Sequence, residues 1–563
     1  MRTPSTIPFS EFIRKISHVP TDEIPRNKIR TLMIHNGLRC ENIHSATLPQ
    51  RWTLSLIKAV LIVTLSTSFV MGVNIGGPNV YNSFIVPWTR GYPFPCQKDD
   101  ETAQWIAQVW WKCDYKKTLL FNKTGYYYLP TTPMDKQVWE RFTDAIHTIC
   151  FVSGGTVGGF TAKYWYKYLT RRNAIVPCMI YQLIASILMI IPLYIYHGYT
   201  RGDPDRKTIR ETFEYKEIAI ALFYISRFLS GLSAGMSCVV TTIYLMDISP
   251  RTMRGNIMTF HQLFIVVGVL VGQIIGVPWL FGQHDKWNWG MAWVGLFSLA
   301  GCFLIWTLPE SPRWLVQERE RNEAAVSLRH LRRSNLIEAE LEEIERQEAS
   351  VTTQDLSFYT MCSSTRFRWP LITSIALNAI QQLSGINTIF FYSHEILSAL
   401  GFVKDRFYWS VISTGLINLV ATVVTLKLVE SIGRRPLILC SLGIITFIMV
   451  LLCIFIQTYL SIAALILMLI FIAVFALGLG PIAFVYPNEV FTIDMRPAAL
   501  SISISANWLC NTLVTIFFPV LSSIFQGYVF LIFCFWCLLA FVLLWYKMPE
   551  TKRKKLSQIQ AFW

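Results

Sequence analysis

The sequence predicts an all-α membrane protein with twelve transmembrane helices in two pseudo-symmetric six-helix halves and a small cytoplasmic helical insertion. Three observations predict this class. The 563 residues are 53% hydrophobic and only 15% charged, a composition of polytopic membrane proteins. Apolar segments long enough to cross a bilayer of roughly 30 Å recur along the chain. Short charged signatures of the first half return in the second half.

Twelve apolar segments set the predicted topology. An even number leaves both termini on one side of the membrane. The basic connections at Lys163 to Arg172, Arg251 to Arg254 and Arg434 to Arg435, and the basic tail from Lys552, place that side in the cytoplasm. The predicted spans are 54–86, 143–164, 174–196, 217–246, 256–281, 289–308, 369–400, 409–428, 436–458, 461–487, 497–524 and 527–547.

The regions outside the spans complete the predicted domain organisation. The N-terminal segment is polar and lacks an apolar core near Met1, so the first span is expected to act as an internal signal-anchor. The net charge of +15 follows the membrane topology, and no nucleic-acid partner is expected. The predicted domains are a cytoplasmic segment 1–53, a first half 54–308 with an extracellular loop 87–142, a cytoplasmic helical linker 309–366, a second half 367–548 and a cytoplasmic tail 549–563.

Three charged signatures occur in both halves in the same order. Each half has a pair of arginines, then an acidic residue and an arginine at equal spacing, then Pro-Glu before a hydroxyl residue. Such a repeat predicts a transporter whose binding site lies between the halves near the bilayer midplane. The matches are Arg171-Arg172 with Arg434-Arg435, Asp247 and Arg254 with Glu489 and Arg496, and Pro309-Glu310-Ser311 with Pro549-Glu550-Thr551.

The most polar stretch inside a predicted span is Gln381 to Ser393. Polar groups are unfavourable in hydrocarbon unless they face a cavity or another helix. Gln381, Ser384 and Thr388 recur at helical spacing, and Gly385 is expected to loosen the helix locally. Amides both donate and accept hydrogen bonds, which suits a neutral ligand rich in hydroxyls. Contacts between packed helices are the alternative interpretation for each residue taken singly.

Further polar and aromatic residues inside other spans are candidates for the same site. Amides can bond to sugar hydroxyls while an indole stacks on the C–H face of the ring. Helix packing has comparable weight for each of them alone. The predicted substrate-binding set is Gln262, Gln381, Gln382, Asn387, Asn418, Phe484, Asn507, Trp508 and Asn511.

Charged residues that remain at span ends gather at the predicted cytoplasmic mouth. Ion pairs at a membrane boundary are structural by default and individually weak when wet. In an alternating-access protein they would instead form a latch that is closed when the cavity faces outward. The predicted cytoplasmic ion-pair latch comprises Arg227 and the pairs Asp247 with Arg254, Glu430 with Arg434 and Arg435, and Glu489 with Arg496.

Several motifs together resemble one family. QQLSGIN at Gln381 to Asn387 closely matches the seventh-helix motif of the facilitative hexose transporters, a sugar-porter branch of the major facilitator superfamily. The stretches DISPRTMRG, PESPRWL, ESIGRR, NEVFTIDMRP and PETK match the family's signatures at the expected places. The resemblance implies the major facilitator fold, sugar ligands at His261-Gln262, Gln381-Gln382, Asn387, Asn418 and Asn511, an external gate at Tyr392, and a linker that pins the two halves together.

The tenth span departs most from the family pattern. The glycine-proline hinge survives as Gly478-Leu479-Gly480-Pro481, a plausible flexing point because glycine and proline weaken the helix. Ala476 replaces a glutamate that contacts sugar in the family, and Phe484 replaces a tryptophan. Further departures are Asn378-Ala379-Ile380 and Phe69 to Val73. Scaffold and mechanism therefore transfer better than substrate identity.

The long loop after the first span contains Cys96, Cys113 and the sequon at Asn122. If this loop is extracellular, a disulfide between the two cysteines and a glycan on Asn122 are both permitted. Chance occurrence is the alternative for a single sequon.

These observations predict a facilitative uniporter of hexose, with D-glucose first, that works as a monomer in the plasma membrane by alternating access. Residues 54–86 contain no acidic residue and Ala476 removes another candidate, so a proton symporter is the less favoured alternative. Fructose, another neutral polyol and a non-transporting sugar sensor stay open. An enzyme is not expected, because no catalytic set, metal site or cofactor motif is found.

Overall fold

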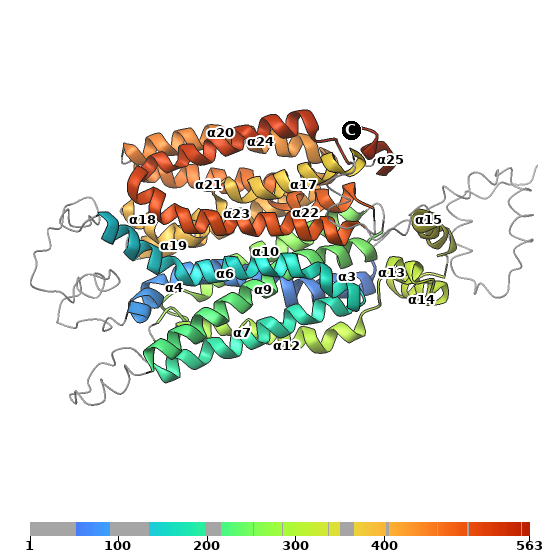
Figure 1. The fold of residues 1–563 in the computed structure, drawn as a ribbon, viewed down its shortest axis with the longest axis horizontal. Helices are drawn as coiled ribbons and strands as arrows, with labels where there is room; N and C mark the ends of the chain where they lie inside the picture. The colour runs from blue at the N-terminus through green and yellow to red at the C-terminus, as the bar shows by residue number, and fades with distance from the viewer. Residues whose placement is uncertain are drawn as a thin grey trace, which may run out of the picture.

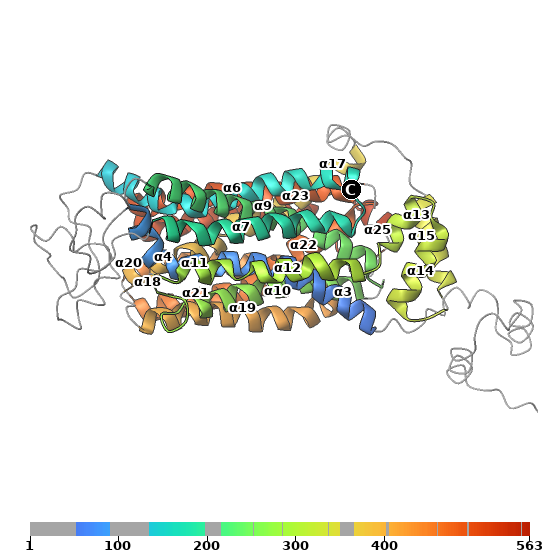
Figure 2. The same cartoon turned by 90° about the horizontal axis from the view of Figure 1, so that it is seen from below.

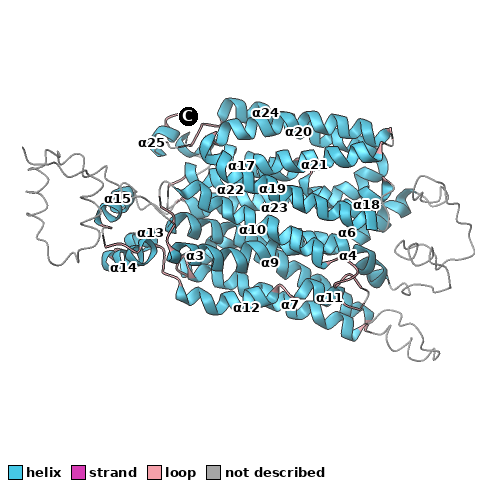
Figure 3. Cartoon of the chain, turned by 180° about the vertical axis from the view of Figure 1, so that it is seen from behind, coloured by secondary structure: helices cyan, strands magenta, loops and turns pink. Residues whose placement is uncertain are grey.

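The computed structural model describes residues 52–90, 134–196, 215–250, 253–283, 285–335, 337–349, 365–400, 405–458, 460–492, 495–552, 554 and 556–563. Within these residues the regular structure is helical throughout (Figure 3). The helices run largely side by side along the longest axis and form two groups, the first half of the chain beside the second (Figure 1).

The first half forms a bundle whose helices pack on one another in sequence-distant pairs. Its elements are α3 (Leu54–Thr64), the π-helix η3 (Leu65–Phe69), α4 (Val70–Arg90), α6 (Met134–Tyr168), η4 (Asn173–Ile175), α7 (Val176–Ile195), α9 (Lys216–Ile248), α10 (Arg254–Ile275), α11 (Trp287–Ala292), α12 (Gly295–Leu304) and η6 (Ile305–Thr307).

The second half and the tail follow after the linker helices. Their elements are α17 (Thr365–Leu383), α18 (Ile386–Ala399), α19 (Asp405–Ser431), α20 (Arg434–Gln457), α21 (Ser461–Leu477), α22 (Leu479–Val490), α23 (Arg496–Phe525), η7 (Gln526–Tyr528), α24 (Val529–Lys547) and α25 (Leu556–Gln560).

Each of the twelve predicted spans coincides with helical structure, which confirms the predicted all-α class. Nine stretches of the described residues are long and apolar enough to cross a membrane, and one of them, Arg496–Lys547, contains both α23 and α24. The helices α6, α17 and α18 are not among the nine. The sequence did not predict the π-helix η3 or the division of the sixth span into α11 and α12.

Glycines allow the closest helix contacts of the first half. A Cβ on Gly231 of α9 would lie 1.8 Å from the backbone oxygen of Phe151, and a Cβ on Gly154 of α6 would lie 2.1 Å from the backbone oxygen of Phe228. The pairing of α4 with α10 has the same cause, since a Cβ on Gly72 would lie 2.0 Å from the backbone oxygen of Ile265. Small residues are what lets membrane helices approach backbone to backbone.

The linker helices α13 (Pro312–Gln317), α14 (Arg321–Arg332) and α15 (Glu338–Ala349) lie beyond one end of the bundle, near α25 (Figures 1 and 2). We call this the linker end, and the opposite end, where α4 ends, the far end. Thr53 donates to the carbonyl of Leu331 at 2.5 Å, and Arg332 donates to the carbonyl of Ile248 at 3.0 Å. These contacts dock the linker helices on the first half; pinning of both halves stays a prediction.

The largest buried apolar cluster contains residues of both halves. A smaller cluster at the far end also joins them, because it contains Val80 and Val277 from the first half and Leu397 and Tyr408 from the second. The two halves therefore share a buried interface, which is where the binding site is predicted to lie.

Candidate functional site

Two helices of the second half break near the interface, and glycine is required at each break. Gly385, between α17 and α18, has a φ of +82°, which side-chain-bearing residues rarely adopt. Gly478, between α21 and α22, has φ −128° and ψ −78°, and a Cβ there would lie 2.8 Å from the carbonyl oxygen of Leu437. The helix is thus interrupted at Gly385, where loosening was predicted, and at Gly478, in the stretch predicted as a flexing point. Flexing itself stays a prediction.

Four of the predicted amides form one hydrogen-bonded group, the amide cluster of Gln381, Gln382, Asn387 and Asn507. Asn507 Nδ2 donates to Gln381 Oε1 at 2.6 Å, and Asn507 Oδ1 accepts from Gln382 Nε2 at 3.0 Å. Asn387 Nδ2 donates to Gln382 Oε1 at 2.6 Å. Residues of α17, α18 and α23 are thus brought together as polar partners inside the membrane-spanning part of the chain.

The amide cluster also reaches the break in the tenth span. Gln381 Nε2 donates to the carbonyls of Leu479 at 3.2 Å and Gly480 at 2.8 Å. On the other side of the break, Thr425 of α19 donates to the carbonyl of Ala476 at 2.9 Å. Ala476 lies in the last turn of α21, whose carbonyls have no donor within their own helix, so Thr425 satisfies a carbonyl that a continuous helix would satisfy itself.

Not every polar residue of the predicted binding face is free for a ligand. Ser384 donates to the carbonyl of Gln381 at 2.9 Å and Thr388 to that of Gly385 at 2.6 Å, so both hydroxyls are used within their own turn. By contrast, the side-chain oxygens of Asn418 and Asn511 are buried and have no hydrogen-bond partner. Buried polar atoms without partners are rare and call for an explanation, such as an absent ligand or water.

The first half faces this region with α10. Gln262 is 8% exposed, and its amide nitrogen lies 3.5 Å from the position that a Cβ on Gly480 would take. His261 accepts or donates a 2.7 Å hydrogen bond with Ser68 through Nδ1, while its Nε2 is buried and unpartnered. The ring of Phe484 lies edge-on to His261, with centroids 5.1 Å apart. α10 therefore faces α22 across the interface between the halves, with Gln262 near Gly480 and His261 against Phe484.

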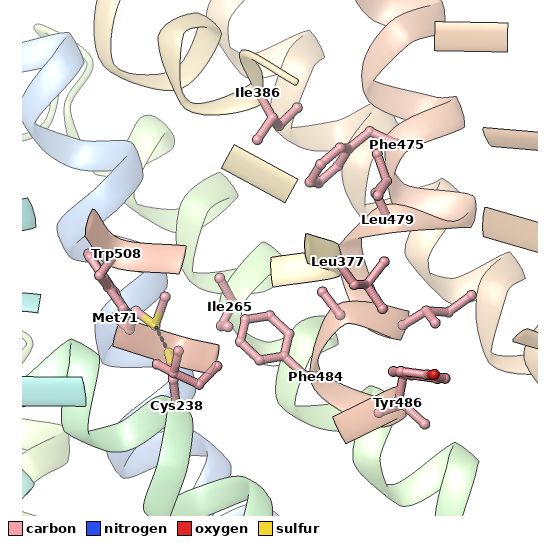
Figure 4. Close-up of a cluster of buried hydrophobic side chains, with 14 of the residues drawn as sticks. Met71, Cys238, Ile265, Leu377, Ile386, Phe475, Leu479, Phe484, Tyr486 and Trp508 are labelled. Atoms are coloured by element: carbon pink, nitrogen blue, oxygen red, sulfur yellow. Dashed lines mark hydrogen bonds between the residues drawn. The ribbon is translucent and has the colours of Figure 1, made fainter. Parts of the chain in front are cut away.

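Trp508 of α23 also bridges the halves, because its indole packs against α6 of the first half. A Cβ on Gly155 of α6 would lie 2.2 Å from Cε3 of the indole, and the Phe151 ring lies 5.7 Å from it. Figure 4 shows Trp508 and Phe484 in the large buried cluster, together with Met71 and Cys238, whose sulfur atoms are 3.5 Å apart. The glycine at position 155 was not predicted as functional; the repeated Gly-Gly pairs in its helix are the signal for it.

Tyr392 lies inside α18 with non-helical φ and ψ of −120° and 17°. Its hydroxyl donates to the carbonyl of Thr515 of α23 at 2.7 Å, and its ring is 5.2 Å from Phe518. The predicted gate residue thus joins two helices of the second half in this structure.

At the linker end, Asp247 of α9 is the centre of a buried ion network that crosses the halves. Its carboxylate lies 3.4 Å from Arg496 of α23 and 3.8 Å from Arg171 of the first half, and it accepts from Ser311 at 3.0 Å. The side chain of Asp247 is 1% exposed and those of Arg171 and Arg496 are each 7% exposed. Such pairs are strongly unfavourable to break, because one charge is left buried and uncompensated.

A second network lies at the start of α20. Arg434 contacts Glu489 at 2.7 Å and Glu430 at 3.1 Å. A Cβ on Gly255 of α10 would lie 2.0 Å from a Glu430 oxygen, so this glycine lets the first half approach the ion pair of the second. Arg435 donates to the carbonyl of Trp545 at 2.6 Å.

The pairing predicted for the latch needs correction. Asp247 pairs with Arg496 instead of Arg254, and Glu489 pairs with Arg434 instead of Arg496. Arg254 makes no ion pair within the described residues, and its Nε is buried without a partner. The equal spacing of Asp247 to Arg254 and of Glu489 to Arg496 reflects the sequence repeat. The ion pairs, by contrast, form between different helices that pack side by side.

Arg227 was predicted to belong to the same network and does not. It is fully buried within α9, where it donates to the side-chain oxygen of Asn74 at 3.4 Å and to its carbonyl at 3.3 Å. The face of Phe151 lies 4.6 Å from the guanidinium carbon. Its partners are thus a neutral amide and an aromatic ring. From here on, the ion-pair latch means the residues that pair in the structure: Asp247, Arg496, Arg171, Glu430, Arg434 and Glu489.

Asn122, Cys96 and Cys113 lie outside the described residues. The cysteines within the described part carry no disulfide, and no cluster of three or more potential metal ligands occurs there.

Comparison with known proteins gives a consistent match over most of the chain. Residues 60–563 match the family model "Sugar (and other) transporter". Facilitated glucose transporter member 2 of solute carrier family 2 from Mus musculus is 32% identical over 422 residues, 73% of this chain and 75% of that protein. Member 1 from Gallus gallus is 30% identical over 419 residues, covering 73% and 80%. Member 9 from Pongo abelii is 26% identical over 545 residues, covering 93% and 85%.

Solved structures share the fold. The proton:xylose symporter XylE bound to 6-bromo-6-deoxy-D-glucose aligns with a TM-score of 0.68 at 24% identity, over 90% of this chain and 99% of that one. The inward-open form of XylE from E. coli aligns with a TM-score of 0.61 at 23% identity, over 90% of this chain and 100% of that one.

Proposed function

Because the chain belongs to the sugar transporter family of the major facilitator superfamily, whose members are membrane transporters and not enzymes, we propose that it is a facilitative hexose uniporter. D-glucose is the first candidate substrate, because members 1 and 2 of solute carrier family 2 are named facilitated glucose transporters. The proposed carrier works as a monomer in the plasma membrane, with the linker end and both termini in the cytoplasm.

One observation supports the proposed sugar site most directly. The amide cluster, the unpartnered oxygens of Asn418 and Asn511, and Gln262 of the opposite half gather neutral donors and acceptors at the interface of the halves. Neutral amides match a sugar, whose hydroxyls donate and accept but carry no charge. A site between the halves is also what a rocking mechanism needs, since both halves then contact the same ligand.

The alternating movement is proposed to combine three parts. The ion-pair latch closes the linker end, the break from Gly478 through Gly480 to Pro481 gives the tenth span its flexing point, and Tyr392 forms part of the gate toward the far end. The flexing point is supported by Gly478, where a larger residue does not fit because its Cβ would contact the backbone of α20.

Uniport is favoured over proton symport by the surroundings of Arg227. A proton-coupled carrier needs a carboxylate in the membrane that changes its protonation with transport. The side chain that Arg227 bonds to is Asn74, whose amide also donates to Gln182 at 3.2 Å. Residues 54–86 contain no acidic residue, so the first span offers no such group. XylE, named a proton:xylose symporter, shares the fold, and symport is therefore the alternative to test.

The proposed function is tested by initial-rate uptake of labelled D-glucose and D-fructose into proteoliposomes, with and without an inward proton gradient. We expect saturable glucose uptake that equilibrates without accumulation and ignores the gradient. Gln382→Ala should lower uptake about tenfold or more, because it removes the donor to Asn507 Oδ1 and the acceptor of Asn387 Nδ2, at a cost of roughly 1–3 kcal/mol.

Gln457→Ala is the matched control, since it removes the same atoms from the far end of α20 and should leave uptake unchanged. Normal uptake by Gln382→Ala would refute the proposed sugar site. Uptake of neither sugar by folded wild-type protein would instead point to another neutral solute or to a sensor, consistent with the changed residues Ala476 and Phe484.

Asn74→Asp should make uptake depend on protons. The new carboxylate would lie within hydrogen-bonding distance of the Arg227 guanidinium, where its charge has to be neutralised or paired whenever the helices move. We expect variant uptake to rise as the external pH falls, while wild-type uptake stays constant. Asn74→Ala is the control without a carboxylate. A wild-type protein that already accumulates sugar on a proton gradient would overturn the uniport proposal.

The remaining site predictions concern the loop outside the described residues. We propose that Asn122 carries a glycan and that Cys96 and Cys113 form a disulfide on the extracellular side.

A further inference from the structure

The short helix α22 contains a proline whose consequence for the backbone is specific. In an α-helix the N–H of residue 487 would donate to the carbonyl of residue 483, four positions earlier. Pro487 has no N–H, so the carbonyl of Ala483 loses its donor within its own helix. Ala483 is fully buried, and a buried carbonyl without a donor is unfavourable.

A side chain of a neighbouring helix replaces that donor. Asn378 of α17 donates through Nδ2 to the carbonyl of Ala483 at 3.1 Å. Its second amide hydrogen goes to the carbonyl of Ser374 at 3.0 Å, which is one turn back in α17. Asn378 is fully buried, and its Oδ1 has no partner. The hydrogen bonds of this side chain are therefore made by its nitrogen alone.

We propose that Asn378 is a positioning residue that substitutes for the helix bond missing at Pro487 and so fixes α22 on α17 beside the sugar site. This proposal deepens the proposed function and rests on it for the link to transport. The bond differs from an ordinary packing contact, because α22 has no internal donor with which to replace it when the two helices separate.

The position of Asn378 connects this bond to the amide cluster. Its own carbonyl accepts from Asn507 Nδ2 at 2.8 Å, and Asn507 orients both glutamines of the cluster. Three residues of α17 thus hold α22 along its length: Gln381 at Leu479 and Gly480, Asn378 at Ala483, and Thr373 at the Tyr486 hydroxyl, 3.1 Å away.

The C-terminal end of α22 connects to the ion-pair latch. Glu489 lies in the last turn of α22 and contacts Arg434. A bond at Ala483 therefore lies between the break at Gly478 and the latch residue. The bond from Asn378 therefore couples the position of α22 to that of α17, the helix that carries Gln381 and Gln382.

A double-mutant cycle between Asn378 and Pro487 tests the proposal. Asn378→Leu keeps the volume and removes the donor, whereas Pro487→Ala returns the N–H that Ala483 lacks. We expect Asn378→Leu alone to lower the maximal rate of glucose uptake about fivefold or more with little change in KM, and to do so less than about twofold when Pro487→Ala is present.

Amide hydrogen exchange over α22 and thermal unfolding in detergent provide readouts that need no substrate. Asn378→Leu should speed exchange in α22 and lower the unfolding temperature, and Pro487→Ala should reverse most of both effects. Asn378→Ser, which is too short to reach Ala483, is the second variant for the same cycle if the leucine variant does not fold.

Thr373→Val is the matched control, because its bond goes to a side chain and should respond equally in both backgrounds. An Asn378 effect of equal size with and without Pro487→Ala would overturn the proposal and leave a packing role. If wild-type protein transports no sugar, the proposed function fails, while the exchange and unfolding cycle still decides the role of Asn378.

Discussion

Asp247→Asn is expected to open the linker end of the molecule. The substitution keeps an acceptor for Ser311 but removes the negative charge that the buried Arg171 and Arg496 share. Breaking a buried ion pair costs roughly 3–5 kcal/mol, most of it the cost of the uncompensated charge. Because Arg496 belongs to the second half, the cost falls on the state in which the halves touch at this end.

The measurement is the alkylation rate of a cysteine placed at Ser501, which is 1% exposed and lies in α23 beyond Arg496. We expect a water-soluble maleimide to label this cysteine about tenfold faster in the Asp247→Asn background, as a shift of 1.4 kcal/mol or more requires. The same protein without the reporter corrects for the native cysteines.

Glu342→Gln provides the matched control. Its ion pair with Arg346 is exposed at 48% and 62% and lies within α15, so its loss should leave the labelling rate unchanged. Equal labelling of Ser501→Cys with and without Asp247→Asn would show that the network does not close the linker end.

Gly155→Ala is expected to reduce transport strongly, although it adds one methyl group. The new Cβ would lie 2.2 Å from Cε3 of Trp508, far inside contact distance, so α6 and α23 would have to separate. These two helices also meet through the hydroxyls of Thr156 and Thr512 at 3.2 Å, which join the two halves. Overpacking costs roughly 1–3 kcal/mol, and here it acts at the surface over which the halves must move.

We expect the uptake rate of Gly155→Ala to fall about tenfold at unchanged expression. Gly443→Ala in α20 is the control, because its Cβ would make an ordinary 3.8 Å contact with Phe541 and should have no effect. Normal uptake by Gly155→Ala would mean that the indole moves aside freely, and the fit between Gly155 and Trp508 would then have no role in transport.

The candidate site was predicted in part from sequence. The amides Gln381, Gln382, Asn387 and Asn507 stood out because polar groups in apolar spans need partners, and the structure brings these four together. Sequence could not tell that Ser384 and Thr388 bond within their own turn, because a hydroxyl at helical spacing looks the same whether it faces a ligand or the preceding carbonyl.

The all-α class, the positions of the spans, the loosening at Gly385 and a weak point at Gly478 could be predicted from sequence, because hydrophobic length and backbone preferences are local properties. By contrast, the charges that pair and the carbonyls that accept from donors of other helices become visible only once the helices are packed. Asp247 meets Arg496, and Asn378 meets Ala483, across 249 and 105 positions of the chain, respectively. Such contacts depend on how helices pack side by side, and spacing along one segment carries no record of it.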